Sequence, residues 1–155
     1  MKANDLMIGD WVQYTAGDGE DYTVRVKSLT LDGYFKEGVS FIPPWDGEVE
    51  VSTLAIQPIP LTPEILEKNG FSWDGSGQRS MMLITPFGRE DKDALRYNIY
   101  VGLKYRTIEV FAAHPQERKP GWRKSNKAFL EVCGPYVHEL QHALRLCGID
   151  KEIVI

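Results

Sequence analysis

Two histidines and a glutamate late in the chain have the spacing of a zinc-peptidase motif. His138, Glu139 and His142 fit the pattern H-E-x-x-H in a segment expected to be helical. Histidines four residues apart lie one turn apart on one helix face. Both imidazoles could therefore hold a zinc ion while the glutamate activates its bound water. The chemistry that this pattern offers is metal-assisted hydrolysis.

The remaining parts of such a site do not follow in the sequence. A catalytic zinc needs a third protein ligand, and the carboxylates that follow the motif are Asp150 and Glu152, shortly after the helix. In the extended form of the motif, Arg145 stands where a glycine is required and Gly148 where a third histidine is required. We therefore predict that the motif is not a catalytic zinc site. A weak metal site at His138 and His142 and a zinc-dependent hydrolase remain the alternatives.

Helix geometry also argues against a catalytic zinc site at this motif. Apolar residues recur at helical spacing and form one stripe, made of Val137, Leu140, Leu144 and Cys147. At about 100° per residue, His138 and His142 lie on the opposite side of the helix, close to Arg145. We expect that side to be solvated.

A basic stretch around one tryptophan offers a second chemistry, nucleic-acid binding. Its members are Arg118, Lys119, Trp122, Arg123, Lys124 and Lys127. Cations can follow a phosphate backbone while an indole stacks on a base. The alternative is a solvated loop between two strands, which Glu117 and the net charge of -4 favour.

Composition limits the class of protein. A chain of 155 residues with 43% hydrophobic and 26% charged residues fits one globular domain or two small ones. Cys133 and Cys147 form no C-x-x-C pair, so we expect two reduced, buried thiols and no four-thiolate zinc site. No leader or membrane-spanning run is visible, and we expect a cytoplasmic protein.

Charge is distributed unevenly along the chain. Residues 1–60 carry ten acidic and four basic side chains, a balance of -6, whereas residues 61–155 carry twelve and fourteen, a balance of +2. Such a modest difference is a weak indication that the two parts have different partners.

The first sixty residues read as short antiparallel strands. Alternating apolar and polar residues predict strands near residues 11–14, 22–29 and 48–51, and Asp32-Gly33 is a hairpin signal. The return strand spans about residues 34–42. Short strands with tight turns favour a small SH3-like antiparallel β-barrel over residues 1–58. Residues 56–61, with two prolines, are expected to be an extended connector.

The remainder, residues 59–155, is expected to be an α+β unit, unless the whole chain forms one compact domain. Thr62 as N-cap, Pro63 at the first position and Asn69-Gly70 at the end delimit a helix. A second helix is expected from about residue 136 to residue 147, ended by Gly148. Strands are expected at residues 71–73, 79–84, 97–101, 107–111, 128–133 and 152–155.

Three stretches resemble a group of short uncharacterised proteins from gut-bacterial genomes, phages and mobile elements. The first contains Met1-Lys2-Ala3-Asn4-Asp5-Leu6 and Ile8-Gly9-Asp10-Trp11-Val12. The second runs from Ile56 through Pro58-Ile59-Pro60-Leu61-Thr62 to Gly70-Phe71. The third is Tyr136-Val137-His138-Glu139-Leu140-Gln141. The resemblance implies an origin in such elements and implies no activity, cofactor or site residue.

Taken together, the sequence leads to the hypothesis of a non-enzymatic binding or adaptor module without a cofactor, acting on a protein partner and not on a membrane. The first alternative is a zinc-dependent hydrolase using His138, His142 and Glu139. The second is a nucleic-acid binder using the basic stretch around Trp122.

Overall fold

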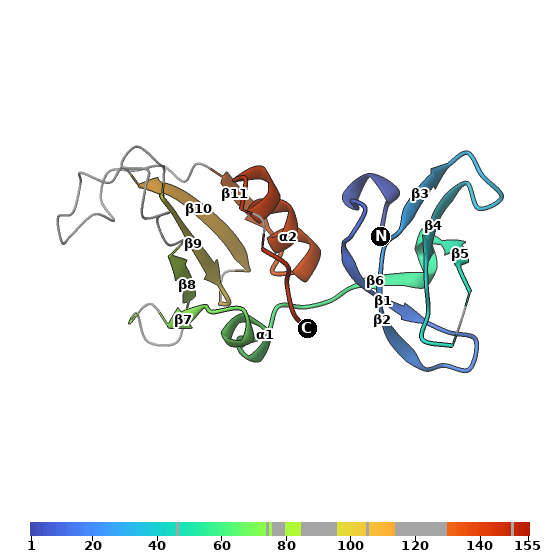
Figure 1. The fold of residues 1–155 in the computed structure, drawn as a ribbon, viewed down its shortest axis with the longest axis horizontal. Helices are drawn as coiled ribbons and strands as arrows, with labels where there is room; N and C mark the ends of the chain where they lie inside the picture. The colour runs from blue at the N-terminus through green and yellow to red at the C-terminus, as the bar shows by residue number, and fades with distance from the viewer. Residues whose placement is uncertain are drawn as a thin grey trace. The chain divides into compact units, whose positions relative to one another are not determined.

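The chain folds into two compact units. Unit 1 consists of Met1–Pro60 together with Tyr136–His142, and unit 2 consists of Leu61–Pro135 together with Ala143–Ile155 (Figure 1). The structure is a computed structural model that describes residues 1–45, 47–73, 75, 80–84, 96–104, 106–113, 130–149 and 151–155. None of the helices in these ranges is long and apolar enough to cross a membrane.

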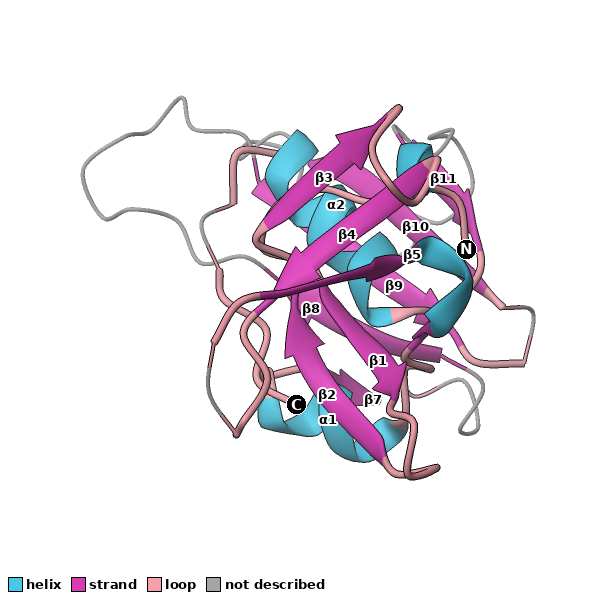
Figure 2. Ribbon diagram, turned by 90° about the vertical axis from the view of Figure 1, so that its right-hand side faces the viewer, coloured by secondary structure: helices cyan, strands magenta, loops and turns pink. Residues whose placement is uncertain are grey.

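Unit 1 is built from two antiparallel three-stranded sheets (Figure 2). The strands are β1 (Trp11–Thr15), β2 (Asp21–Arg25), β3 (Ser28–Leu31), β4 (Glu37–Phe41), β5 (Val49–Ser52) and β6 (Ile56–Pro58). Their orders are β2-β1-β6 and β3-β4-β5, and the two ladders do not close into one barrel. Short 3-10 helices lie at Ala3–Asp5 and Thr53–Ala55. The antiparallel character is confirmed, and the SH3-like barrel remains a prediction.

The core of unit 1 comes from the inward-facing positions of these strands. Its buried members are Leu6, Val12, Val24, Val26, Val39, Phe41 and Ile56. Tyr14 packs on Phe41 with ring centroids 4.9 Å apart. Each fully buried valine or phenylalanine stabilises the fold by roughly 1.5–3 kcal/mol, so the alternation that predicted strands also supplies the driving force for their packing.

The expected single strand over residues 22–29 is wrong, because the chain changes sheets within it. The Val26 amide donates to the carbonyl oxygen of Asp10, just before β1, at 2.9 Å. The next amide, that of Lys27, donates to the main-chain carbonyl oxygen of Ser40, in β4 of the other sheet, at 2.8 Å. Val24 and Val26 both face the core, so the alternation continues across the break. The expected connector at residues 56–61 begins as β6 at a sheet edge, where Pro58 needs no ladder donor.

Unit 2 contains one antiparallel five-stranded sheet of order β11-β10-β9-β8-β7 and the short helix α1 (Pro63–Lys68). The strands are β7 (Ser72–Trp73), β8 (Ser80–Ile84), β9 (Arg96–Gly102), β10 (Thr107–Ala113) and β11 (Leu130–Cys133). With the helix α2 (Val137–Leu146), whose first half belongs to unit 1 and second half to unit 2, the chain is an α+β protein, as predicted.

Both helices end as the sequence predicts. The Thr62 hydroxyl oxygen accepts a hydrogen bond from the Ile65 amide at 3.3 Å. At the other end, Gly70 has a φ of 79° and the Phe71 amide donates to Leu66 at 3.0 Å. Helix α2 closes in the same manner, since Gly148 has a φ of 67° and the Ile149 amide donates to the Leu144 oxygen at 2.9 Å. These are Schellman closures that satisfy terminal carbonyl groups.

The predicted final strand at residues 152–155 is wrong. The segment pairs with a side chain and not with a sheet, although Ile153 is buried as expected. Asn69, itself 2% exposed, donates from Nδ2 to the carbonyl oxygen of Val154 at 2.7 Å and accepts from the Val154 amide at 3.0 Å. Its amide therefore replaces the neighbouring peptide group that a strand would have supplied.

We expect Asn69→Ala to destabilise the protein by roughly 1–3 kcal/mol, because it leaves both backbone groups of Val154 without their partner. Asn69→Asp should also destabilise, since a carboxylate can accept from the Val154 amide but cannot donate to its oxygen. Urea denaturation and amide exchange at Val154 measure the effect. Unchanged Val154 protection in Asn69→Ala would contradict this account.

Candidate functional site

The histidines of the H-E-x-x-H motif lie inside unit 1. They belong to the first half of α2, where His138 is only 4% exposed and the neighbouring Gln141 is 5% exposed. The predicted apolar stripe of this helix is confirmed, because Val137 and Leu140 are fully buried. The expected solvated opposite side is wrong in this half of the helix, since His138 is buried and the His142 side chain is only 18% exposed.

His142 is bound by a carboxylate that comes from the start of the chain. Its Nε2 lies 2.7 Å from Oδ2 of Asp10, a residue with no exposed surface. The same oxygen accepts a hydrogen bond from the Met7 amide at 2.8 Å. Asp10 thus holds its own turn together and anchors the helix.

Gln141 makes a second, bidentate attachment to the same turn. Its Oε1 accepts from the Trp11 amide at 2.9 Å, and its Nε2 donates to the Gly9 oxygen at 3.1 Å. A buried amide that satisfies both a donor and an acceptor of the main chain avoids the desolvation penalty of either group. Sequence reasoning missed Asp10 and Gln141 as partners, although both lie in the stretches that carry the resemblance.

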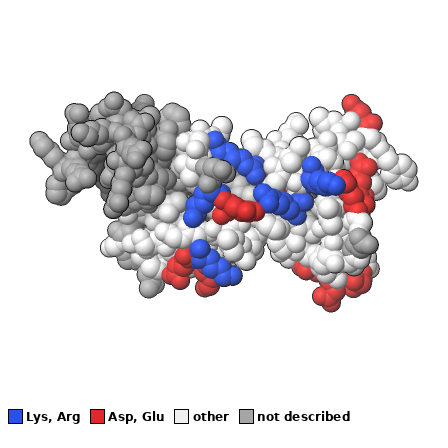
Figure 3. Space-filling view, in the orientation of Figure 1, with Lys and Arg blue, Asp and Glu red and all other residues white. Residues whose placement is uncertain are grey.

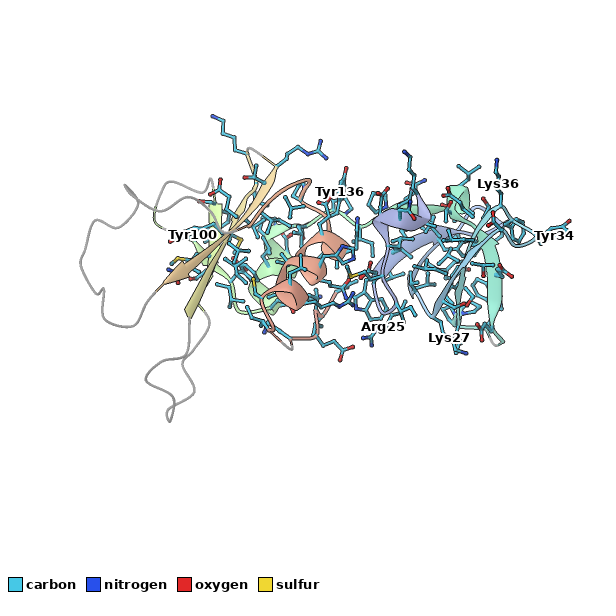
Figure 4. The ribbon with its side chains drawn as sticks, turned by 90° about the horizontal axis from the view of Figure 1, so that it is seen from above. Arg25, Lys27, Tyr34, Lys36, Tyr100 and Tyr136 are labelled. Atoms are coloured by element: carbon cyan, nitrogen blue, oxygen red, sulfur yellow. The ribbon has the colours of Figure 1, made fainter. Side chains whose placement is uncertain are left out.

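His138 is a buried ring that stacks on Tyr136 and contacts His142 edge-on. Its ring centroid lies 5.9 Å from that of Tyr136 (Figure 4), and the two ring planes differ by 13°. The centroid of His142 lies 5.8 Å away, with an interplanar angle of 79°. Burial lowers the pKa of His138 to about 4; the nearby His142 acts in the same direction and Asp10 opposes it. His138 is therefore neutral at pH 7, and its Nδ1 is buried without a hydrogen-bond partner.

Glu139 is half-buried beside this cluster. Burial raises the pKa of its carboxyl group, while a backbone hydrogen bond from Tyr136 and the charge of His142 lower it. One carboxyl oxygen, Oε2, is buried without a partner. In a zinc peptidase the equivalent glutamate faces a metal-bound water.

These residues do not fit a catalytic zinc centre. Two ligand atoms about 2 Å from a tetrahedral zinc lie about 3.3 Å from each other, whereas Nε2 of His142 and Oδ2 of Asp10 are 2.7 Å apart. That is a hydrogen-bond distance. Within the described ranges, no group of three or more His, Cys, Asp and Glu side chains could hold a metal ion.

The nucleic-acid site stays a prediction, and the Cys147 thiol is buried as expected. The residues predicted to bind nucleic acid lie outside the described residues: Arg118, Lys119, Trp122, Arg123, Lys124 and Lys127. Cys147 is a free, buried thiol, and burial raises its pKa, which opposes a nucleophilic role.

A surface that sequence reasoning missed lies at the turn between β1 and β2. Tyr22 and Trp45 make an edge contact with ring centroids 4.6 Å apart, and Trp45 remains 51% exposed. Three acidic residues, Asp18, Glu20 and Asp21, are exposed next to Tyr22 in the chain. We call these five residues the aromatic–acidic surface. Figure 3 shows acidic side chains at the lower edge of unit 1, and others at its right-hand and upper edges.

The turn itself holds the carboxylates in place. The Ala16 amide donates to the main-chain carbonyl oxygen of Glu20 at 2.9 Å, and Gly19 takes a φ of 85°. Asp18 accepts from the Glu20 amide at 3.0 Å. Desolvation and then the negative charges of Asp18 and Glu20 raise the pKa of the Tyr22 hydroxyl, which also hydrogen-bonds the side chain of Asp18.

Comparison with known proteins identifies no relative. No model of a known protein family matches the chain, and neither curated proteins nor solved structures include a match.

The buried His138 predicts a loss of stability in acid. The unfolded chain binds a proton at about pH 6.5, whereas the folded chain does so only near pH 4. The contribution of the neutral His138 to stability is therefore complete only well above pH 6.5, and it falls as the pH is lowered towards 4, by at most about 1.4 kcal/mol per pH unit. His138→Phe keeps an aromatic ring and removes the titration, so urea denaturation should show a shallower acid loss. Parallel pH profiles for the two proteins would refute this.

The coupling between His142 and Asp10 can be tested with two replacements of His142, one that removes the hydrogen-bond donor and one that keeps a donor. We expect His142→Leu to destabilise the protein by about 1–3 kcal/mol, because Asp10 stays buried and loses a donor. In His142→Gln the amide nitrogen reaches about as far as Nε2 and should restore part of that loss. In an Asp10→Asn background, both replacements should have smaller effects. Equal effects in both backgrounds would show that His142 and Asp10 are not coupled.

Proposed function

We propose that this protein is a non-enzymatic binding or adaptor module that recognises another protein in the cytoplasm. The resemblance noted above adds the proposal that it is an accessory protein of a phage or mobile element. We also propose that unit 1 is an SH3-like β unit; two small antiparallel sheets around one core support this.

The observation that carries the proposal is the aromatic–acidic surface. A tryptophan side chain that is 51% exposed gives up the stabilisation that burial would provide. Tyr22 contacts its ring edge-on, which restricts its orientation without covering it. Large aromatic side chains of this kind are enriched among the residues that dominate protein–protein binding.

The contacts of the H-E-x-x-H motif support the non-enzymatic part of the proposal. His142 is engaged with Asp10, and His138 is buried against Tyr136. Both imidazoles are thus engaged in contacts within unit 1, in the positions where a hydrolase would need them to bind zinc. The nucleic-acid alternative stays a prediction, because its residues lie outside the described ranges.

We expect a protein partner to be lost when Trp45 is replaced. Affinity-tagged wild-type protein, Trp45→Ala and the control Tyr34→Ala would be expressed in cells that encode the protein, cross-linked and analysed by mass spectrometry. The control removes an aromatic that is 94% exposed at the β3–β4 turn, which lies at the opposite end of unit 1 from the β1–β2 turn (Figures 1 and 2). Wild type and Tyr34→Ala should recover the same protein, and Trp45→Ala should not.

The hydrolase alternative predicts a different result, which is a bound zinc ion. Untagged protein purified without chelator should contain substoichiometric zinc. About one equivalent of zinc, together with a peptidase activity that Glu139→Gln abolishes, would overturn the proposed function.

A further inference from the structure

We propose that the aromatic–acidic surface binds an arginine or lysine side chain presented by an extended segment of the protein partner. This inference rests on the proposed function and specifies the chemistry of the partner at the same surface. The evidence is a set of carboxylates that lack basic partners, an open tryptophan ring beside them, and three nearby glycines that face open space.

The carboxylates of unit 1 divide into those that are engaged and those that are not. Asp10 is bonded to His142, and Glu48 is paired with Lys27 and accepts from the Ser40 hydroxyl. The carboxylates of the aromatic–acidic surface have uncharged partners only. Within the described part of the chain, no lysine or arginine pairs with Asp18, Glu20 or Asp21.

The side chains of Asp18 and Asp21 hydrogen-bond to groups of the β1–β2 hairpin. Asp18 accepts from the Glu20 amide, and Asp21 accepts from the Thr15 hydroxyl at 2.6 Å. These bonds fix the turn and leave the negative charge uncompensated. Like charges held so close together repel, and a cation from outside would relieve that repulsion.

Trp45 supplies the second element of cation recognition. The face of an indole attracts a guanidinium or ammonium group, and does so best of the aromatic side chains. Unit 1 already contains one such contact, because the Arg25 guanidinium carbon lies 5.8 Å from the centroid of the Trp11 ring. Trp45 offers the same chemistry without being buried.

Three glycines near the surface face open space. A Cβ atom added at Gly17, Gly19 or Gly47 would meet no atom within 4 Å. Gly17 and Gly19 flank Asp18, and Gly47 lies two residues after Trp45. At these three main-chain positions, nothing described blocks the approach of a partner segment.

Charge selects the class of occupant. Nucleic acids and anionic lipid surfaces carry the same sign as Asp18, Glu20 and Asp21 and would be repelled. A peptide with arginine or lysine is attracted at a distance and gains the cation–π contact when it docks. We therefore assign the surface to a basic segment of a protein.

The test uses three fluorescein-labelled nonapeptides with the same glycine–serine frame. One contains two arginines, one two lysines and one two glutamines, and each is titrated with the full-length protein by fluorescence anisotropy. We expect binding of the arginine and lysine peptides, no binding of the glutamine peptide, and weaker binding as salt is raised from about 20 to about 150 mM.

Matched variants separate this surface from general attraction to an acidic protein. Trp45→Ala should weaken binding about fivefold, and Asp18→Asn combined with Glu20→Gln about tenfold. Tyr34→Ala and Asp32→Asn, at the β3–β4 turn, should leave it unchanged. If Trp45→Ala lowers the thermal midpoint, the double carboxylate variant on the exposed turn still decides the matter.

Several outcomes would overturn the inference. They are no binding of either cationic peptide, equal losses in the control variants, or a dimer in light scattering that Trp45→Ala dissociates. The last result would assign the surface to a second copy of the chain. If no cationic peptide binds while a cross-linked partner still depends on Trp45, the proposed function stands and only the cation chemistry fails.

Discussion

Unit 1 depends on the attachment of residues 136–142 to a turn near the start of the chain. The bonds from Gln141 to Gly9 and Trp11 and from His142 to Asp10 join residues 130 to 132 positions apart. The Val137 amide adds a bond to the Ile59 oxygen at 2.9 Å. Without this segment Asp10 would lose a donor from its buried carboxylate, and the turn from Gly9 to Trp11 would lose two main-chain partners.

This attachment engages the side chains that match the zinc-peptidase pattern. A histidine pair one helical turn apart suits zinc when its nitrogen atoms face an open position. Here one ring is buried and neutral, with its pKa lowered to about 4, and the other is hydrogen-bonded to a carboxylate. The same side chains that match a peptidase pattern are the polar interior of a small β unit.

Local features were the easiest to predict from the sequence. The caps of both helices, from Thr62 to Gly148, depend on neighbouring residues alone, and the structure has them as predicted. The burial of His138 depends on contacts with residues far away in the chain, which helix periodicity does not contain. The prediction of a strand at residues 152–155 was wrong for a related reason, because the side-chain amide of Asn69 takes the place of a neighbouring strand. The Tyr22–Trp45 contact likewise joins strand β2 to the turn between β4 and β5, which no short motif relates.

The long separation between the two sides of unit 1 also has a consequence for synthesis on the ribosome. Gly9 to Trp11 are made first, and their partners follow 130 residues later. At roughly 5–20 residues per second, the N-terminal strands wait on the order of ten seconds for the helix that completes them. During that interval unit 2 is being translated, so the first unit to be started is completed only after most of the second has been made.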